Sequence, residues 1–139
     1  MATDTDNRTT LMRIDHVALY CRDLEGMRAF LEKYFQGKPN ELYHNPRTHL
    51  RTYILTFPQG ATRLEIMTRP EVGGNNEDLF HSGFIHLSFA VGSRKAVDAL
   101  TERLRADGYE TLSGPRTTGD GYYESCVRGF EGILIEITV

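Results

Sequence analysis

The stretch FIHLSFAV, residues 84–91, begins the second copy of a pattern that the chain contains twice. Side chains of a β-strand point alternately to its two faces, so His86 and Ser88 share one face while aliphatic and aromatic side chains occupy the other. The earlier stretch IDHVALY, residues 14–20, alternates in the same way around His16. Each stretch is followed by a helical pattern and by three further strand-like runs, which predicts an internal repeat.

The first copy continues with an amphipathic helix. Asp23 can cap this helix, because its carboxylate accepts a hydrogen bond from an N–H group of the first turn. Apolar residues then recur at helical spacing, Gly37 suits the helix end, and Pro39 prevents continuation. The apolar positions are Leu24, Met27, Phe30, Leu31, Tyr34 and Phe35. Runs rich in β-forming residues predict strands at 41–44, 50–57 and 62–68.

The second copy has the same order of elements. Ser93 can cap a helix that carries apolar residues at helical spacing and ends near Gly108. Strands are predicted at residues 109–112, 122–128 and 133–139. Residues 113–121 hold three glycines and a proline, which predicts a loop there. This loop does not resemble a phosphate cradle, because it lacks the GxxxxGK[ST] spacing and no capped helix follows it.

The repeat predicts an α+β fold of two βαβββ modules with curved mixed sheets and helices on the outside. We expect a flexible tail at residues 1–11 and a single domain at 12–139. Within that domain the modules span about 12–69 and 84–139, and the linker is 70–83. The aliphatic faces of the strands need a cover, which the two helices supply, so the opposite faces turn inward.

Composition excludes several classes of function. The formal net charge is −3, and the basic residues are scattered along the chain, which favours neither nucleic acid nor a membrane surface as a partner. No apolar run approaches the ~20 residues of a transmembrane helix. The polar N-terminal residues do not resemble a signal peptide, and Cys21 and Cys126 have no CxxC spacing, so we expect reduced thiols and a cytoplasmic location.

Four inward-facing residues predict a metal site, namely His16, Glu65, His86 and Glu136. Each pair joins the first strand of a module to its last strand, over 49 residues in the first module and 50 in the second. A buried carboxylate is costly unless it is paired or binds a metal. Any one of these residues alone is typical of a half-buried histidine or a solvated glutamate. Their repetition at equivalent positions favours one divalent ion, and two imidazoles with two carboxylates suit Ni, Zn, Co or Mn.

The segments that carry these residues resemble a known family. IDHVAL, RLEIM, FIHLSFAV and LIEI are similar to the four ligand-bearing strands of the vicinal-oxygen-chelate superfamily, over about residues 12–139. This group includes glyoxalase I, extradiol dioxygenases, methylmalonyl-CoA epimerase and the fosfomycin and bleomycin resistance proteins. The order His, Glu, His, Glu most resembles bacterial glyoxalase I, or lactoylglutathione lyase.

The resemblance implies a carbon–sulfur lyase that converts the hemithioacetal of an α-keto aldehyde to a 2-hydroxyacyl thioester through an enediolate, in methylglyoxal detoxification. It also implies that Glu136 moves the proton, that Glu65 is a ligand and a possible partner base, and that the protein is a homodimer. Two alternatives stay open: another metal-dependent reaction on the same frame, such as epimerisation or ring cleavage, or a non-catalytic protein that sequesters a drug or metabolite. The thiol, the metal and the question whether one chain or two complete the site also stay open.

Other polar residues are weaker candidates. Four arginines could bind substrate carboxylates through their guanidinium forks, although single arginines are typical of solvated surface charge. They are Arg47, Arg51, Arg69 and Arg116. His44, His49 and His81 are expected at the surface, and His81 could line the mouth of the pocket because it directly precedes the third ligand strand.

Overall fold

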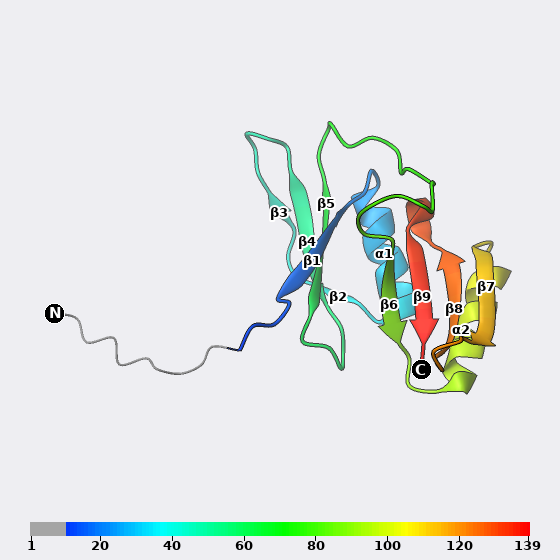
Figure 1. The fold of residues 1–139 in the computed structure, drawn as a ribbon. Helices are drawn as coiled ribbons and strands as arrows, with labels where there is room; N and C mark the ends of the chain where they lie inside the picture. Colours follow the sequence, from blue (N-terminus) through cyan, green and yellow to red (C-terminus); the bar gives the residue numbers. More distant parts are fainter. Residues whose placement is uncertain (1–10) are drawn as a thin grey trace, which may run out of the picture.

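The computed structural model describes residues 11–139. Most of the predicted N-terminal tail, residues 1–10, therefore lies outside the described residues. Two mixed sheets and two helices make up the described part of the chain (Figure 1), which confirms the predicted α+β class. Neither helix, at 12 and 13 residues, is long and apolar enough to cross a membrane.

The first module forms one sheet with helix α1 against it. The strand order is β1-β5-β4-β2, with the short strand β3 also paired to β4, and β1 runs parallel to β5. The elements are β1 (His16–Tyr20), α1 (Leu24–Phe35), β2 (Lys38–Pro39), β3 (Tyr43–His44), β4 (Arg51–Thr56) and β5 (Arg63–Thr68). Of these, only β2 was not predicted, because Gly37 and Pro39 indicate the end of a helix at this point of the sequence.

The second module repeats this arrangement. Its strand order is β6-β9-β8-β7, and β6 runs parallel to β9 as β1 does to β5. The elements are β6 (His86–Ala90), α2 (Arg94–Ala106), β7 (Glu110–Thr117), β8 (Tyr123–Arg128), a 3-10 turn η1 (Phe130–Gly132) and β9 (Leu134–Thr138). The repeat that the sequence predicts is therefore confirmed.

Both predicted helix caps are present. The Asp23 side chain accepts a 2.9 Å hydrogen bond from the N–H of Gly26, and the Ser93 side chain accepts a 3.1 Å bond from the N–H of Ala96. These bonds satisfy N–H groups that have no partner within the helix.

The predicted loop at 113–121 is partly wrong, since β7 continues through Thr117. The strand lies at the edge of its sheet and pairs with β8 across two register shifts, so Pro115 removes no hydrogen bond from a central ladder. Gly114 makes the close approach possible: its φ is 76°, and a Cβ there would lie 2.4 Å from the Glu124 carbonyl oxygen.

The core joins the two modules behind the sheets. The α1 side chains Phe30 and Phe35 contact the second module, where Phe35 stacks on Phe89 at 4.3 Å between ring centroids and Phe30 lies 6.2 Å from Phe130. Glu131, next to Phe130, accepts hydrogen bonds of 2.8 and 2.7 Å from the backbone N–H groups of Arg22 and Asp23. The start of α1 is thus fixed by the second module.

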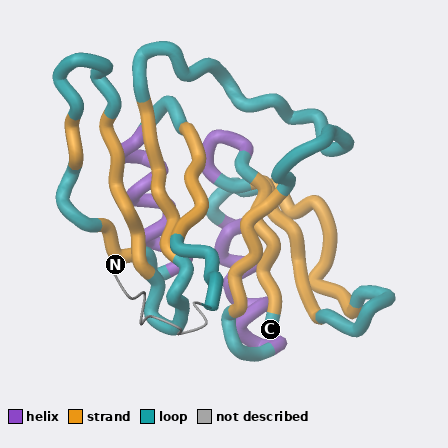
Figure 2. The backbone as a smooth tube through the Cα atoms, turned by 60° about the vertical axis from the view of Figure 1, so that its left-hand side comes forward, coloured by secondary structure: helices purple, strands orange, loops and turns teal. Residues whose placement is uncertain are grey.

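The two sheets do not close into a barrel. Strands β1 and β6 are terminal strands of their sheets, so each has a neighbour on one side only within residues 11–139. Figure 2 shows the sheets next to each other, with the segment between β5 and β6 crossing from one to the other as a long loop. The faces turned away from the helices are therefore open.

Candidate metal centre

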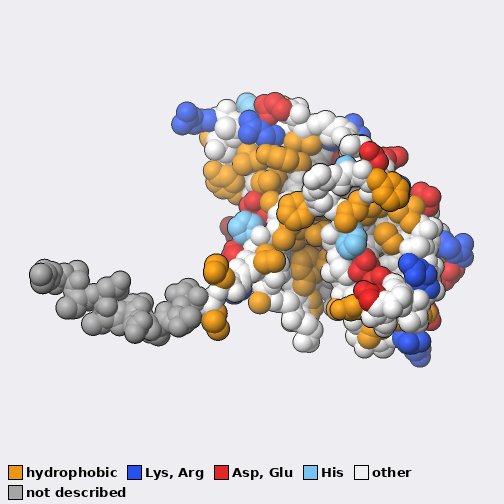
Figure 3. All heavy atoms as spheres, viewed as in Figure 1, with side chains coloured by type: hydrophobic (Ala, Val, Ile, Leu, Met, Phe, Trp, Pro, Cys, Tyr) orange, Lys and Arg blue, Asp and Glu red, His pale blue; other side chains and the backbone are white. Residues whose placement is uncertain are grey.

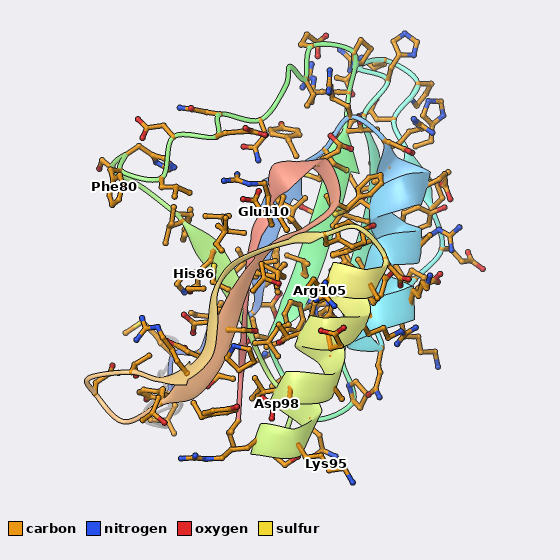
Figure 4. The ribbon with its side chains drawn as sticks, turned by 90° about the vertical axis from the view of Figure 1, so that its right-hand side faces the viewer. Phe80, His86, Lys95, Asp98, Arg105 and Glu110 are labelled. Carbon is orange, nitrogen blue, oxygen red and sulfur yellow. The ribbon has the colours of Figure 1, made fainter. Side chains whose placement is uncertain are left out.

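His86 and Glu136 form the half of the candidate site that belongs to the second module. They lie on the adjacent parallel strands β6 and β9, where Ser88 is the register partner of Glu136. The His86 Nε2 and Glu136 Oε2 atoms are 3.4 Å apart, and the side chains are 36% and 22% exposed. Figure 4 shows His86 on the side of the sheet away from α2. Both donor groups therefore face the open inner surface, as predicted.

Polar groups surround the Glu136 carboxylate. The Ser88 hydroxyl donates a 2.9 Å hydrogen bond to its Oε1 atom, and Cys126 is its register partner on β8. Glu124 lies two residues before Cys126 and so shares this face. Burial, and next the neighbouring Glu136, raise the pKa of the Glu124 carboxyl to about 7. Glu124 and Glu136 are therefore neighbouring carboxyl groups on one face of this sheet.

His16 and Glu65 form the corresponding half in the first module. In the parallel pairing of β1 with β5, His16 is opposite Arg63 and Ala18 is opposite Glu65, so all four share the face away from α1. The intervening residues Val17 and Leu19 pack against the core instead.

The two glutamates have different surroundings. Glu65 lies between Ala18 on β1 and Ile54 on β4, neither of which has a polar side chain. Within residues 11–139, its carboxylate has no ion-pair or hydrogen-bond partner, whereas Glu136 has His86 and Ser88. The spacing predicts two equivalent glutamates, but of the two only Glu136 has polar partners within residues 11–139.

Asp15 orients the His16 ring. Its Oδ2 atom lies 2.8 Å from His16 Nδ1 and 2.6 Å from a guanidinium nitrogen of Arg63. The hydrogen bond with His16, followed by that with Arg63, lowers the pKa of Asp15 to about 2. A carboxylate on Nδ1 leaves Nε2 free to bind a metal, which is the usual arrangement around metal-ligating histidines.

The two halves do not meet within one chain. Across residues 11–139, no group of three or more histidine, cysteine, aspartate or glutamate side chains is gathered as a metal site would require. Each module instead presents one imidazole and one carboxylate on an open face. This donor set suits one half of a four-ligand site for a divalent ion, so the shared centre stays a prediction.

The open faces are also rich in exposed apolar side chains. Ile14 and Tyr20, at the two ends of β1, are 63% and 54% exposed, and Phe84 and Ile85, just before β6, are 90% and 41% exposed. Figure 3 shows hydrophobic side chains and histidines side by side on this surface. Contiguous apolar surface of this kind is typical of an interaction site.

The remaining candidates lie in two places. His81 and His86 both line a cavity of about 450 Å³ beneath the linker, together with Arg128. His81 Nδ1 lies 2.9 Å from the Ser82 carbonyl oxygen. Arg116 is paired with Glu124 in the register of β7 with β8 and therefore shares the inner face.

The other three arginines belong to the far end of the first module. Arg51 and Arg69 line a separate pocket there. Arg47 lies in the turn between β3 and β4, where its N–H donates to the Asn45 side chain at 2.9 Å. Arg51 points to the helix side of the sheet, whereas Arg69 also lines a neighbouring pocket together with Tyr20 of β1.

The sequence pattern did not single out Asp15, Ser88 and Glu124, which the structure places beside the candidate ligands. The signal for Ser88 and Glu124 was present, since strand alternation puts each on the same face as a predicted ligand. Asp15 could not be found in this way, because alternation assigns adjacent residues to opposite faces. Asp15 directly precedes β1, so strand alternation does not determine where its side chain lies.

Comparison with known proteins agrees with this architecture. Residues 13–137 match the family model described as the Glyoxalase/Bleomycin resistance protein/Dioxygenase superfamily. No curated protein matches the sequence.

Solved structures share the fold. A glyoxalase family protein from Bacillus cereus has a TM-score of 0.79 at 19% identity, covering 95% of this chain and 96% of that one. A possible glyoxalase from the same organism has 0.66 at 25% identity, over 93% and 100%. The fosfomycin resistance protein FosX from Listeria monocytogenes, complexed with Mn(II) and sulfate, has 0.69 at 18% identity, over 94% and 93%.

Proposed function

The chain belongs to the Glyoxalase/Bleomycin resistance protein/Dioxygenase superfamily, and on that premise we propose that it is a metal-dependent lyase of the glyoxalase I type. The observation that carries the proposal is the paired arrangement of His16 with Glu65 and of His86 with Glu136. Each pair lies on the first and last strands of its module and faces the open inner surface. Such a donor set, placed twice by the same topology, fits one shared divalent ion.

The proposed reaction isomerises the hemithioacetal of an α-keto aldehyde to a 2-hydroxyacyl thioester. A divalent ion held by the four residues would supply Lewis-acid polarisation of substrate oxygens. Glu136 removes the proton from the carbon that carries sulfur and returns it to the neighbouring carbon, so no oxidant or added water is needed. Ser88 holds the carboxylate through the 2.9 Å hydrogen bond during this transfer.

We further propose that two copies of the chain complete each centre as a homodimer. The proposal is supported by the separation of the two pairs in one chain, by the single-sided strands β1 and β6, and by the apolar surface next to them. The first-module pair of one copy would join the second-module pair of the other. A symmetric dimer of this kind forms two identical centres.

The test begins with the metal content of the purified protein. We expect about one divalent ion per chain, and loss of that ion in a His86→Ala/Glu136→Gln double variant. The metal-free protein is then loaded in turn with Ni, Zn, Co and Mn and assayed with methylglyoxal and several thiols. The expected result is thioester formation that requires a metal.

Two outcomes would reject the lyase proposal. A protein that binds metal but forms no thioester with any thiol would point to another reaction of the superfamily, such as epimerisation or ring cleavage. A protein that binds no divalent ion under any of these conditions would favour a non-catalytic binder.

A further inference from the structure

A second pocket lies at the end of the first module, where the turn between β3 and β4 meets the segment after β5. Its volume is about 570 Å³, within the usual range of small-molecule sites. Figure 3 shows basic side chains, with acidic side chains among them, at this end of the molecule, at the top of the view used in Figure 1. The polar lining comes from Arg22, His44, His49, Arg51, Thr68 and Arg69.

This pocket is separate from the candidate metal centre. Arg51 and Thr68 are register partners on β4 and β5. Thr68 is three residues beyond Glu65 on the same strand, so the two side chains point to opposite faces of the sheet. The part of the pocket formed by Arg51 and Thr68 therefore lies on the helix side of the sheet, and Arg22, just before α1, lines it as well.

The three arginines of the pocket are not fully neutralised by the protein. Within residues 11–139, Arg51 has no carboxylate partner within 4.0 Å, and the Arg22 guanidinium reaches Glu131 only at 4.0 Å. The Glu131 oxygens already accept hydrogen bonds from two backbone N–H groups. Among the residues that the structure describes, Arg69 has a close ion pair with Glu71. Arg51 is therefore the one arginine of this pocket without a carboxylate partner within residues 11–139, and Arg22 is held only weakly by Glu131.

We propose that this pocket binds the phosphate group of a small phosphorylated molecule. Guanidinium groups donate in a planar fork that fits phosphate oxygens in pairs, and such charge-assisted hydrogen bonds are the strongest available here. The guanidinium groups of Arg51 and Arg22 provide these paired donors, and the rings of His44 and His49 add further N–H donors. Pro70 and Val72 line the same pocket and offer apolar surface to the organic part of the ligand.

The test is a calorimetric titration of the metal-free protein with inorganic phosphate, glycerol phosphate and acetate at constant ionic strength. We expect saturable binding of both phosphates below about 10 mM and tighter binding of glycerol phosphate. Arg51→Gln and Arg22→Gln are each expected to weaken binding about tenfold, the usual effect of losing one charge-assisted hydrogen bond. Arg105→Gln is the matched control, since Arg105 pairs with Glu102 on the exposed face of α2.

Several results would overturn this proposal. They are absence of saturable phosphate binding, equal binding of acetate, failure of glycerol phosphate to bind where inorganic phosphate does, or unchanged affinity in Arg51→Gln. Thermal unfolding of each variant shows that it is folded. Because the protein is metal-free in this experiment, its outcome is independent of whether the lyase proposal is right.

Discussion

Ser88 donates a hydrogen bond of 2.9 Å to the Glu136 carboxylate. The residue at the equivalent position beside Glu65 is Ala18, which has no hydroxyl group. The two modules therefore share a backbone arrangement and a ligand pair but differ in how they hold the carboxylate. A base that moves a proton benefits from a fixed orientation, whereas a simple ligand can be oriented by the metal itself.

Ser88→Ala tests the importance of this hydrogen bond. Removing a group that orients a metal ligand typically lowers metal affinity or activity by about 10–100-fold, and we expect a loss in that range. The measurements are a metal titration of the metal-free protein and the turnover of the loaded protein. Ser113→Ala serves as the control, because Ser113 is the register partner of Cys126 and has no hydrogen bond to Glu136 within residues 11–139. Equal losses of metal affinity and turnover in the two variants would contradict a specific role of the Ser88 hydroxyl.

Glu136→Gln keeps the size of the side chain and one oxygen ligand but removes the basic carboxylate. Turnover is expected to fall by ~10²–10⁴-fold, the usual contribution of a positioned general base. Metal should be retained in part, because three proposed ligands remain, and folding should be little affected. Glu65→Gln is expected to have a smaller effect on turnover. Near-normal turnover of Glu136→Gln at full metal occupancy would assign the base to another group.

Asp15 is expected to act through His16. Asp15→Ala removes the acceptor that lies 2.8 Å from Nδ1, so metal affinity should fall by about 10–100-fold. Asp15→Asn keeps an oxygen acceptor at the same place and should restore much of that affinity. The tautomer of His16, followed by nitrogen NMR in the metal-free protein, provides a readout that does not depend on activity. A merely structural role would leave the tautomer unchanged in both variants.

Most of the fold could be predicted because its signals are local. Strand alternation around His16 and His86, helical spacing after Asp23 and Ser93, and the repetition of this order are all visible in the sequence. The structure confirms each of these elements within a few residues. The face assignments follow from the same alternation and are also confirmed.

The relationships that the sequence did not predict depend on distant parts of the chain. Register determines that Ser88 lies beside Glu136, and alternation alone cannot fix the register between strands far apart in sequence. The continuation of β7 past Gly114 depends on a close approach to Glu124. The open arrangement of the two sheets is a property of module packing, which repeat spacing does not encode.

Tyr34 and Asp107 link the two helices and provide a test of that packing. The Tyr34 hydroxyl donates a 2.5 Å hydrogen bond to Asp107, which lowers the pKa of Asp107, while burial and then this bond raise the pKa of Tyr34 to about 12. A lowered carboxyl pKa stabilises the fold above its ordinary value near 4, and a raised phenol pKa stabilises it below about 10.

Tyr34→Phe should therefore lower the free energy of unfolding between these limits, by a small amount because Asp107 is exposed and solvent screens the bond. The difference from the unmodified protein should shrink below pH 4 and above pH 10. Urea unfolding across this range measures it. Tyr109→Phe is the control, because within residues 11–139 the Tyr109 hydroxyl has no hydrogen-bond partner. A similar loss of stability in this variant would mean that the effect comes from packing and not from the hydrogen bond.

The proposed dimer makes a prediction that separates it from a site completed within one chain. One variant carries His16→Ala and Glu65→Gln, and a second carries His86→Ala and Glu136→Gln, so each alone has no intact four-ligand set. If centres form between copies, a mixed dimer contains one centre with all four original ligands. Unfolding and refolding an equal mixture should then restore roughly one quarter of the unmodified activity, because about half of randomly assorted dimers are mixed. Light scattering confirms that dimers have formed. Dimers without restored activity would mean that each centre is completed within a single chain.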